Sequence, residues 1–165
     1  MEACNINVES PDSPNPEMKK NKEIVEALYK ALGDGETETV AGLVASDLDW
    51  WFHGPPERQH MRRVLTGESG YDEFAFEPRS VTPIGEDCVI VEGWEGAQAY
   101  WVHVWNVKEG VITRFREYFN TWLTVKDLRP CWEVGHEVTN DTSTIWQSQP
   151  QDLHHRSFPG LMLAI

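Results

Sequence analysis

Three consecutive segments rich in β-branched and aromatic residues constrain the fold of this chain more than any other feature. They cover residues 87–95, 99–107 and 111–124, and turns that contain Gly96 and Gly110 separate them. Segments of this length and composition, divided by glycine-bearing turns, are typical of β-strands. The sequence therefore predicts an antiparallel meander in the second half of the chain.

The turn between the second and third segments predicts how these two strands pair. Its sequence fits a three-residue hairpin loop with the glycine in the left-handed conformation, which places Val107 opposite Val111. His103 then lies opposite Phe115 and diagonal to Glu117. Because side chains alternate between the two faces of a strand, one face is predicted to hold a histidine and a carboxylate within an aromatic wall. The residues predicted on that face are Trp101, His103, Trp105, Phe115, Glu117 and Phe119.

Apolar residues before the meander recur with helical spacing. Residues 18–33 carry an apolar stripe that predicts an amphipathic helix, with Asn21 as its N-cap and Gly33 at its end. A second short helix is expected at residues 36–45. The elements expected next are an aromatic strand, a third helix and an edge strand bent at a proline, at residues 48–53, 57–70 and 72–82.

The two ends of the chain differ in composition from the part between them. Residues 1–17 are polar and acidic with three prolines, so they are predicted to form a disordered tail. Residues 18–130 are expected to form a single α+β domain. Residues 131–165 are expected to form an extension that docks on this domain or on a partner subunit, because their last eight residues are largely apolar.

Charge and composition exclude several classes of function. The formal net charge of −13 disfavours binding to nucleic acid and to anionic membranes. No apolar run approaches the roughly 20 residues that span a bilayer, and the first residues lack the pattern of a signal peptide. Three cysteines are too few for a disulfide framework, so a cytoplasmic location, extending to the nucleus, is predicted.

No metal or cofactor is predicted. His154, His155 and Cys131 lack the spacing of a metal site. The chain has neither a phosphate-binding glycine loop nor a nucleophile elbow.

Glu117 and His103 are the candidates for acid–base chemistry. Burial in an aromatic wall raises the pKa of a carboxyl group, which suits proton transfer near neutral pH, and a neighbouring histidine could act as its partner. The structural alternatives are a carboxylate paired with an arginine and a histidine hydrogen-bonded within the core. The predicted ligand-binding residues are Trp50, Phe52, His53, Glu95, Trp101, Phe115 and Phe119, although most of the aromatic side chains are expected to fill the interior. Glu95 depends on the register of the 95–98 loop, because a different register brings Glu92 to that face instead.

Four stretches carry a resemblance to a known superfamily: DLDWWFHGPP, FEPRSVTPIGEDCVIVEGWE, YWVHVWNVKEGVITRFREYFNTWLTV and SFPGLMLAI. The chain resembles the nuclear-transport-factor-2-like (SnoaL-like) superfamily, and within it the plant wound-induced protein 1 and senescence-associated group. The resemblance implies a cone-shaped α+β roll, in which N-terminal helices close one face of a strongly curved, mainly antiparallel sheet into a pocket. It also implies a functional carboxylate at Glu117. An epoxide-hydrolase-like pattern would match Glu95 as a second acid, but it requires an arginine where Gly93 stands.

These observations lead to three expectations about function. The first is a wound-, stress- or senescence-responsive plant protein whose pocket binds a small apolar or weakly polar metabolite. The second is a cofactor-free isomerase, cyclase or dehydratase that uses Glu117 with His103. The third is a non-catalytic dimeric scaffold whose pocket is filled by its own tryptophans. A homodimer is expected through the other face of the sheet, at Val102, Val104, Arg114, Arg116 and Tyr118.

Overall fold

The structure is a computed structural model that describes residues 15–95, 99–120, 123–126, 144–148 and 161–164. Its helices are α1 (Pro16–Asp34), α2 (Thr37–Leu43), the short 3-10 helix η1 (Pro56–Arg58) and α3 (His60–Leu65). Its strands are β1 (Val44–His53), β2 (Pro78–Ile84), β3 (Cys88–Glu95), β4 (Ala99–Lys108), β5 (Val111–Phe119), β6 (Leu123–Lys126), β7 (Thr144–Gln147) and β8 (Leu161–Ala164).

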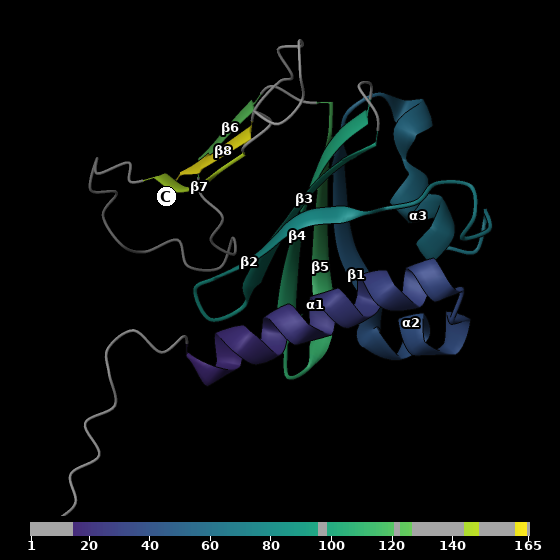
Figure 1. The fold of residues 1–165 in the computed structure, drawn as a ribbon, viewed down its shortest axis with the longest axis horizontal. Helices are drawn as coiled ribbons and strands as arrows, with labels where there is room; N and C mark the ends of the chain where they lie inside the picture. The colour runs from purple at the N-terminus through teal and green to yellow at the C-terminus, as the bar shows by residue number, and fades with distance from the viewer. Residues whose placement is uncertain (1–14, 96–98, 121–122, 127–143, 149–160, 165) are drawn as a thin grey trace, which may run out of the picture.

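Five strands form the main sheet, in the order β1-β5-β4-β3-β2. The strand β1 runs parallel to β5, and the other neighbours are antiparallel, so the sheet is mixed. Figure 1 shows α1 crossing the main sheet, with α2 and α3 near the edge of the sheet that β1 forms. The three-stranded sheet β6-β8-β7 lies apart from the helices. The predicted α+β class, with the helices against one face of the sheet, is confirmed.

The first helix begins and ends at other residues than the sequence predicts. Asn15, not Asn21, is the N-cap, and its side chain accepts a hydrogen bond of 3.0 Å from the backbone N–H of Glu17. Pro16, at the first helical position, has a backbone angle already suited to a helix. Asn21 is buried within α1 and donates to the backbone oxygen of Glu86 at 2.8 Å. The helix ends at Gly35, whose φ of 71° is the left-handed conformation of a C-cap.

The third predicted helix and the strand after it are shorter than expected. Residues 57–70 form only η1 and α3, and β2 starts at Pro78 instead of residue 72. The strand β2 lies at the edge of the sheet, as its proline predicts.

The hairpin between β4 and β5 is tighter than predicted. Lys108 pairs with Val111, so the loop holds only Glu109 and Gly110, both with positive φ (52° and 83°), as in a type I′ turn. A bulge at Thr113 then shifts β5 by one residue relative to β4. The predicted register is therefore wrong, although the six residues predicted on the aromatic face do share one face. Alternation predicts Ile112 on the opposite face, but it lies before the bulge and packs in the inner core.

The shorter turn and the bulge together bring the two acid–base candidates directly opposite each other. His103 pairs with Glu117, Trp101 with Phe119, and Trp105 with Phe115. The register of the preceding hairpin is also settled, because Glu95 pairs with Ala99.

The strand expected at residues 111–124 is divided into two strands in separate sheets. β5 ends at Phe119, because Asn120 takes a left-handed φ of 48° and pairs with Tyr100 through two hydrogen bonds of 2.8 Å. Leu123–Lys126 then forms β6, which pairs with β8.

Apolar side chains pack on both faces of the main sheet. We call the face toward the helices the inner face; its core also contains Val25, Leu28, Val40, Met61 and Val64 from the three α-helices. We call the opposite side the outer face; its core consists of Cys88, Ile90, Tyr100, Val102, Val104, Tyr118 and, from β7, Trp146. The boundary between domain and C-terminal extension at residue 130 falls outside the described residues. Residues 1–14 of the predicted tail (1–17) do so too, whereas Asn15, Pro16 and Glu17 form the start of α1.

Candidate functional site

A connected chain of polar side chains lies on the inner face. The indole N–H of Trp105 donates to the hydroxyl oxygen of Tyr29 at 2.9 Å, and this oxygen lies 2.5 Å from Nδ1 of His103. On the other side of the imidazole, Nε2 of His103 forms a short hydrogen bond with Oε2 of Glu117. The four side chains come from α1, β4 and β5, and none is more than 7% exposed.

The donors and acceptors of this chain define where its protons lie. Because the Tyr29 oxygen accepts from Trp105, its own hydrogen is available to donate to Nδ1 of His103. The imidazole then carries its hydrogen on Nε2 and donates it to the Glu117 carboxylate. This is the arrangement in which every donor has an acceptor, and it leaves His103 neutral.

Burial supports the same protonation states. It lowers the pKa of His103, against the opposing effect of the Glu117 charge, because the imidazolium form would lose its hydration. It also raises the pKa of the Tyr29 hydroxyl well above its usual value. Tyr29 and His103 are therefore both neutral near pH 7, and their hydrogen bonds connect Tyr29 to Glu117 through the imidazole.

Aromatic rings enclose His103. Trp101 stacks on the imidazole with ring centroids 4.4 Å apart, and Phe115 and Phe76 contact it at 4.9 and 5.0 Å. Phe119, Phe115, Trp101 and Trp105 are all exposed by no more than 2%. Within the described residues, the indole nitrogen of Trp101 has no hydrogen-bond partner although it is buried. The aromatic wall predicted from the sequence is thus packed tightly around the polar chain, with one donor left unpaired.

The first strand places its predicted residues on both faces. Trp50 and Phe52 pair in register with Phe115 and Glu117 and pack half-buried against the inner core. The guanidinium of Arg62 lies 4.1 Å from the centre of the Trp50 ring. His53 does not join them, because it is exposed and its ring lies near those of Trp51 and Tyr118 on the outer side.

The two remaining candidate carboxylates are those of Glu95 and Glu92. The backbone of Glu95 is placed by its pairing with Ala99, but its side chain lies outside the described residues. Glu92 lies on the outer face beside Trp94. The alternative register that would bring Glu92 inward is therefore not adopted.

Gly93 shows why the hydrolase-like arginine is absent. A Cβ atom at this position would lie 2.2 Å from the Trp101 ring and 2.8 Å from the backbone oxygen of Glu77. Such contacts are much shorter than van der Waals distances, so no larger side chain fits. The space in which the epoxide-hydrolase-like pattern requires an arginine is occupied by Trp101.

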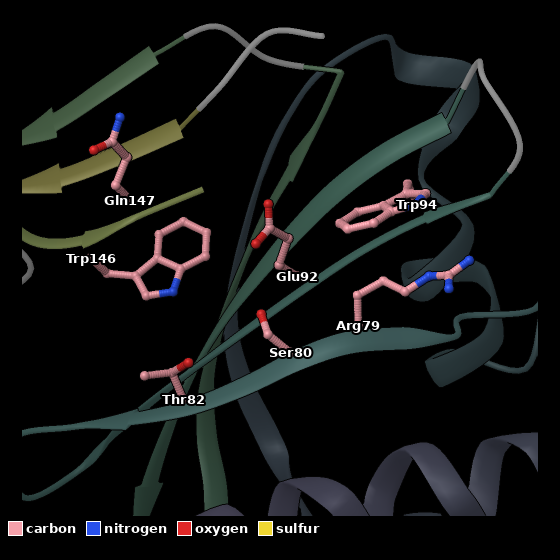
Figure 2. A pocket seen from close by; sticks show the side chains of 7 residues that line it. All are labelled: Arg79, Ser80, Thr82, Glu92, Trp94, Trp146 and Gln147. Carbon is pink, nitrogen blue, oxygen red and sulfur yellow. The ribbon is translucent and has the colours of Figure 1, made fainter. Parts of the chain in front are cut away.

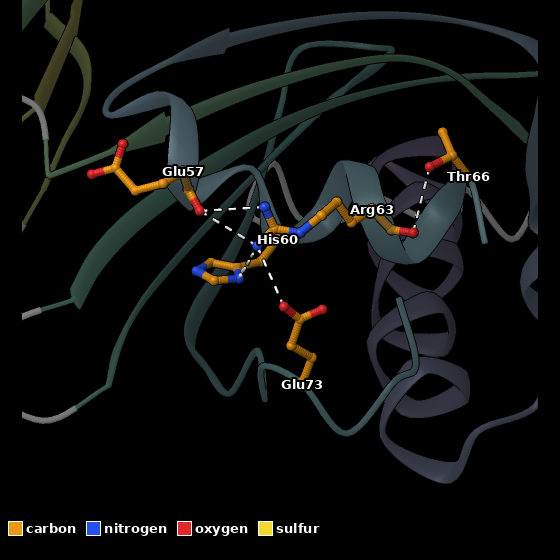
Figure 3. A network of polar contacts seen from close by, with 5 residues as sticks. All are labelled: Glu57, His60, Arg63, Thr66 and Glu73. Carbon is orange, nitrogen blue, oxygen red and sulfur yellow. Dashed lines mark hydrogen bonds and ion pairs between the residues drawn. The ribbon is translucent and has the colours of Figure 1, made fainter. Parts of the chain in front are cut away.

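Arg63 forms hydrogen bonds and an ion pair within the segment that covers the inner face, as Figure 3 shows. Its guanidinium donates to the backbone oxygen of Glu57 at 3.3 and 3.4 Å and to Nδ1 of His60 at 3.1 Å, and it lies 3.6 Å from the Glu73 carboxylate. His60 in turn stacks on Phe74 at 4.5 Å. We call residues 56–76 the roof, because Phe74 and Phe76 of this segment pack against Phe119, Trp101 and His103.

Sequence reasoning missed Tyr29 and the two roof phenylalanines. Tyr29 lies beside Leu28 on the buried side of α1, where the stripe pattern treats every large side chain as core. A hydroxyl on that stripe was the available signal, because a buried tyrosine usually has a hydrogen-bond partner.

The described residues offer neither a metal site nor a reactive thiol. They contain no cluster of three or more His, Cys, Asp or Glu placed to hold a metal ion. Burial raises the pKa of the Cys88 thiol to about 12, so this thiol is protonated and unreactive near neutral pH. None of the described helices is long and apolar enough to cross a membrane.

A curved mixed sheet covered by helices, with a tyrosine, a histidine and a carboxylate inside it, defines an α+β protein with a buried polar site. The model of the family "Wound-induced protein WI12" matches residues 61–165, and the chain belongs to this family. The matched region contains His103 and Glu117, whereas Tyr29 precedes it.

Two curated plant proteins are similar to this chain. Wound-induced protein 1 of Solanum tuberosum is 36% identical over 106 residues, and the match covers 62% of this chain and 99% of the relative. Senescence associated gene 20 of Arabidopsis thaliana is 38% identical over 116 residues, with the same coverage. Among solved structures, an NTF-2 like protein of unknown function from Burkholderia xenovorans matches with a TM-score of 0.49 and 18% identity, over 76% of this chain and all of that one.

Proposed function

We propose that this member of the wound-induced and senescence-associated family binds a small, mostly apolar metabolite at the inner face. The chain from Trp105 through Tyr29 and His103 to Glu117 would recognise the polar group of this ligand. The aromatic rings around His103 would contact its apolar part.

The buried polar chain is the observation that carries this proposal. Placing a carboxylate, an imidazole and a phenol in an apolar interior costs free energy, which apolar residues of similar size would not cost. Such groups are therefore frequent at functional sites. The unpaired indole N–H of Trp101, adjacent to His103, supplies a donor for an acceptor atom of the ligand.

Ligand entry requires the roof to move. The roof ring that touches His103 is that of Phe76. Met61 and Val64 anchor α3 in the core, so only residues 66–76 of the roof would move. The ion pair of the partly exposed Arg63 with Glu73 contributes little free energy, so the main cost of opening is the loss of the ring contacts of Phe74 and Phe76.

Native mass spectrometry of the intact protein, after incubation with a plant metabolite extract, tests this proposal. We expect an adduct on the wild type that is lost or weakened in Glu117→Gln, which keeps the shape of the side chain and still accepts from His103. The matched control is Glu38→Gln on the exposed side of α2, which should keep the adduct. If no adduct forms on any variant, the binding proposal is wrong and the inner face is a filled core, as in the scaffold alternative.

A second candidate function is cofactor-free acid–base catalysis by Glu117 and His103. The direct pairing of these two residues, with Tyr29 on the far nitrogen, favours it, because the three form a continuous proton path. The same spectra would reveal it as a change in the mass of the ligand. Turnover that survives in Glu117→Gln would eliminate this candidate.

The predicted homodimer would use a surface that is covered within one chain. Val102, Val104 and Tyr118 are exposed by at most 3%, and Trp146 packs against their cluster. Dimerisation through this surface therefore competes with the docking of Trp146. Light scattering of the wild type and of Trp146→Ala tests this: a two-chain mass that is favoured by the substitution would support the dimer, and a one-chain mass for both would contradict it. The cytoplasmic or nuclear location stays a prediction, which a fluorescent fusion would test.

A further inference from the structure

A cavity of about 790 Å³ lies on the outer face, between the main sheet and the strand β7. Figure 2 shows that its lining side chains come from β2, β3 and β7. The volume is within the range of about 300–1,000 Å³ that is usual for small-molecule pockets. The inner-face site and this cavity lie on opposite sides of β3 and β4.

Glu92 gives the cavity an almost completely buried carboxylate. It is 4% exposed, and the hydroxyl of Tyr100 donates to its Oε1 at 3.1 Å, which orients the carboxyl group. Figure 2 shows the indole rings of Trp94 and Trp146 on either side of Glu92. A carboxylate between two indole rings is complementary to an ammonium group, because both the negative charge and the faces of the rings attract a cation.

Arg79 gives the cavity a positive charge. Strict alternation along β2 would direct this side chain to the inner face, but the pairing shifts between Pro78 and Ser80, so that Arg79 is the bulged residue. Bulges of this kind redirect a side chain. Arg79 thus lies on the outer side with its guanidinium 5.2 Å from the centre of the Trp94 ring, and it forms no ion pair with any described residue.

We propose that this cavity binds a small zwitterion with an apolar body, as in a free amino acid or a short peptide. The ammonium group binds Glu92, the carboxylate binds Arg79, and the apolar body lies against Trp94 and Trp146. Ser80, Thr82 and Gln147 line the same cavity and add neutral donors and acceptors. A ligand with only one of these charges forgoes one of the two ionic contacts, so both charges are needed for full affinity.

Calorimetric titration of the full-length protein with matched probes tests this assignment. L-phenylalanine carries both charges, phenethylamine only the ammonium, and 3-phenylpropionate only the carboxylate. We expect L-phenylalanine to bind more tightly than either single-charge probe by about tenfold or more, since hydrogen bonds to charged groups are worth roughly 1.5–3 kcal/mol. The dipeptide Phe-Phe distinguishes the two kinds of ligand, free amino acids and short peptides. Tighter binding of the dipeptide identifies peptides as the natural class, and tighter binding of L-phenylalanine identifies free amino acids.

Two substitutions assign each charge to its side chain. In Glu92→Gln, which still accepts from Tyr100, the advantage of L-phenylalanine over 3-phenylpropionate should disappear. In Arg79→Gln, the advantage of L-phenylalanine over phenethylamine should disappear. Arg62→Gln is the matched control, because Arg62 also lies over an indole ring, that of Trp50, but away from the cavity.

Failure of L-phenylalanine and the dipeptide to bind the wild type would overturn the proposal. So would an advantage of L-phenylalanine that persists in both variants. These outcomes are independent of the metabolite proposed for the inner face, because Glu117→Gln should leave binding of L-phenylalanine unchanged.

Discussion

The hydroxyl group of Tyr29 contacts two buried nitrogen atoms, Nε1 of Trp105 and Nδ1 of His103. The substitution Tyr29→Phe removes this oxygen and leaves both nitrogens without a partner. Each buried group left unsatisfied costs roughly 1–3 kcal/mol, so we expect the free energy of unfolding to fall by about 2–5 kcal/mol.

Urea denaturation measures this loss, with Tyr71→Phe as the matched control. Tyr71 is half-buried at the edge of the inner core and forms no hydrogen bond through its hydroxyl within the described residues, so its substitution should change stability by less than about 0.5 kcal/mol. Equal effects of the two substitutions would mean that the polar chain contributes nothing to stability.

Gly93 is a second residue at which a single added atom, a Cβ, would disturb the packing. In Gly93→Ala, the new Cβ would lie 2.2 Å from the Trp101 ring, which has no room to move because it is fully buried. We expect a loss of about 1–3 kcal/mol, typical of overpacking, in thermal or urea denaturation.

Gly33→Ala provides the comparison for this substitution. Gly33 lies in α1, and a Cβ there meets no atom within 4 Å, so alanine should stabilise the protein by roughly 0.5–1 kcal/mol through its better helix propensity. A neutral result at Gly93 would show that Trp101 does not occupy the predicted space.

At the level of elements, the tight turn between β4 and β5 makes a prediction about Glu109. Its φ of 52° is unfavourable for most residues, whereas Asn-Gly is the preferred pair for a type I′ turn. Glu109→Asn should therefore raise the free energy of unfolding by about 0.5–1 kcal/mol.

Lys108→Asn, one residue earlier, places the same side chain in the strand. It should be slightly destabilising, because asparagine is disfavoured in strands. Destabilisation by Glu109→Asn in chemical denaturation would contradict the type I′ turn.

The helices and strands also show which features of the fold the sequence could predict and which it could not. Periodicity identified α1 and the strands, and alternation placed His103 and Glu117 on one face. It could not locate the bulge at Thr113, because strict alternation does not hold across it: Ile112 and Phe115 both pack on the inner face. Direct pairing of His103 with Glu117 follows from that extra residue together with the shorter turn, each of which shifts the register by one residue.

Contacts between elements that lie far apart in the sequence could not be predicted from it. Tyr29 meets His103 across 74 residues, and no local pattern specifies which helix residue faces which strand residue. The outer cavity depends on Trp146, in a stretch where the sequence shows no clear period. The helix start was missed because Asn15 and Pro16 lie in a segment whose composition resembles a disordered tail.

For the whole molecule, the neutral His103 predicts how stability depends on pH. Burial lowers the pKa of His103 below its ordinary value of 6.5. The unfolded chain therefore takes up a proton at a higher pH than the native protein does. Stability is fully present above about pH 6.5 and is lost as the pH falls from there through the pKa of the folded state.

Urea denaturation at several pH values from 8 to 5, on the wild type and His103→Gln, isolates this effect. Glutamine can donate to Glu117 and accept from Tyr29 but does not titrate, so the variant should lose less stability on acidification. Burial lowers the pKa of His60 too, but that contribution is common to both proteins. Equal losses in the two proteins would show that His103 is not held neutral.

The parallel pairing of β1 with β5 has a consequence for the synthesis of this protein. The two strands are joined in register from Asp49 with Arg114 to His53 with Tyr118. On the ribosome, α1, α2 and β1 emerge long before the strand that completes their shared core. Until then, the apolar side chains of β1 have no sheet to join and stay exposed. A nascent chain that ends before Val111 therefore lacks Phe115, Glu117 and Phe119, and the polar chain of the inner face is completed only when β5 is in place.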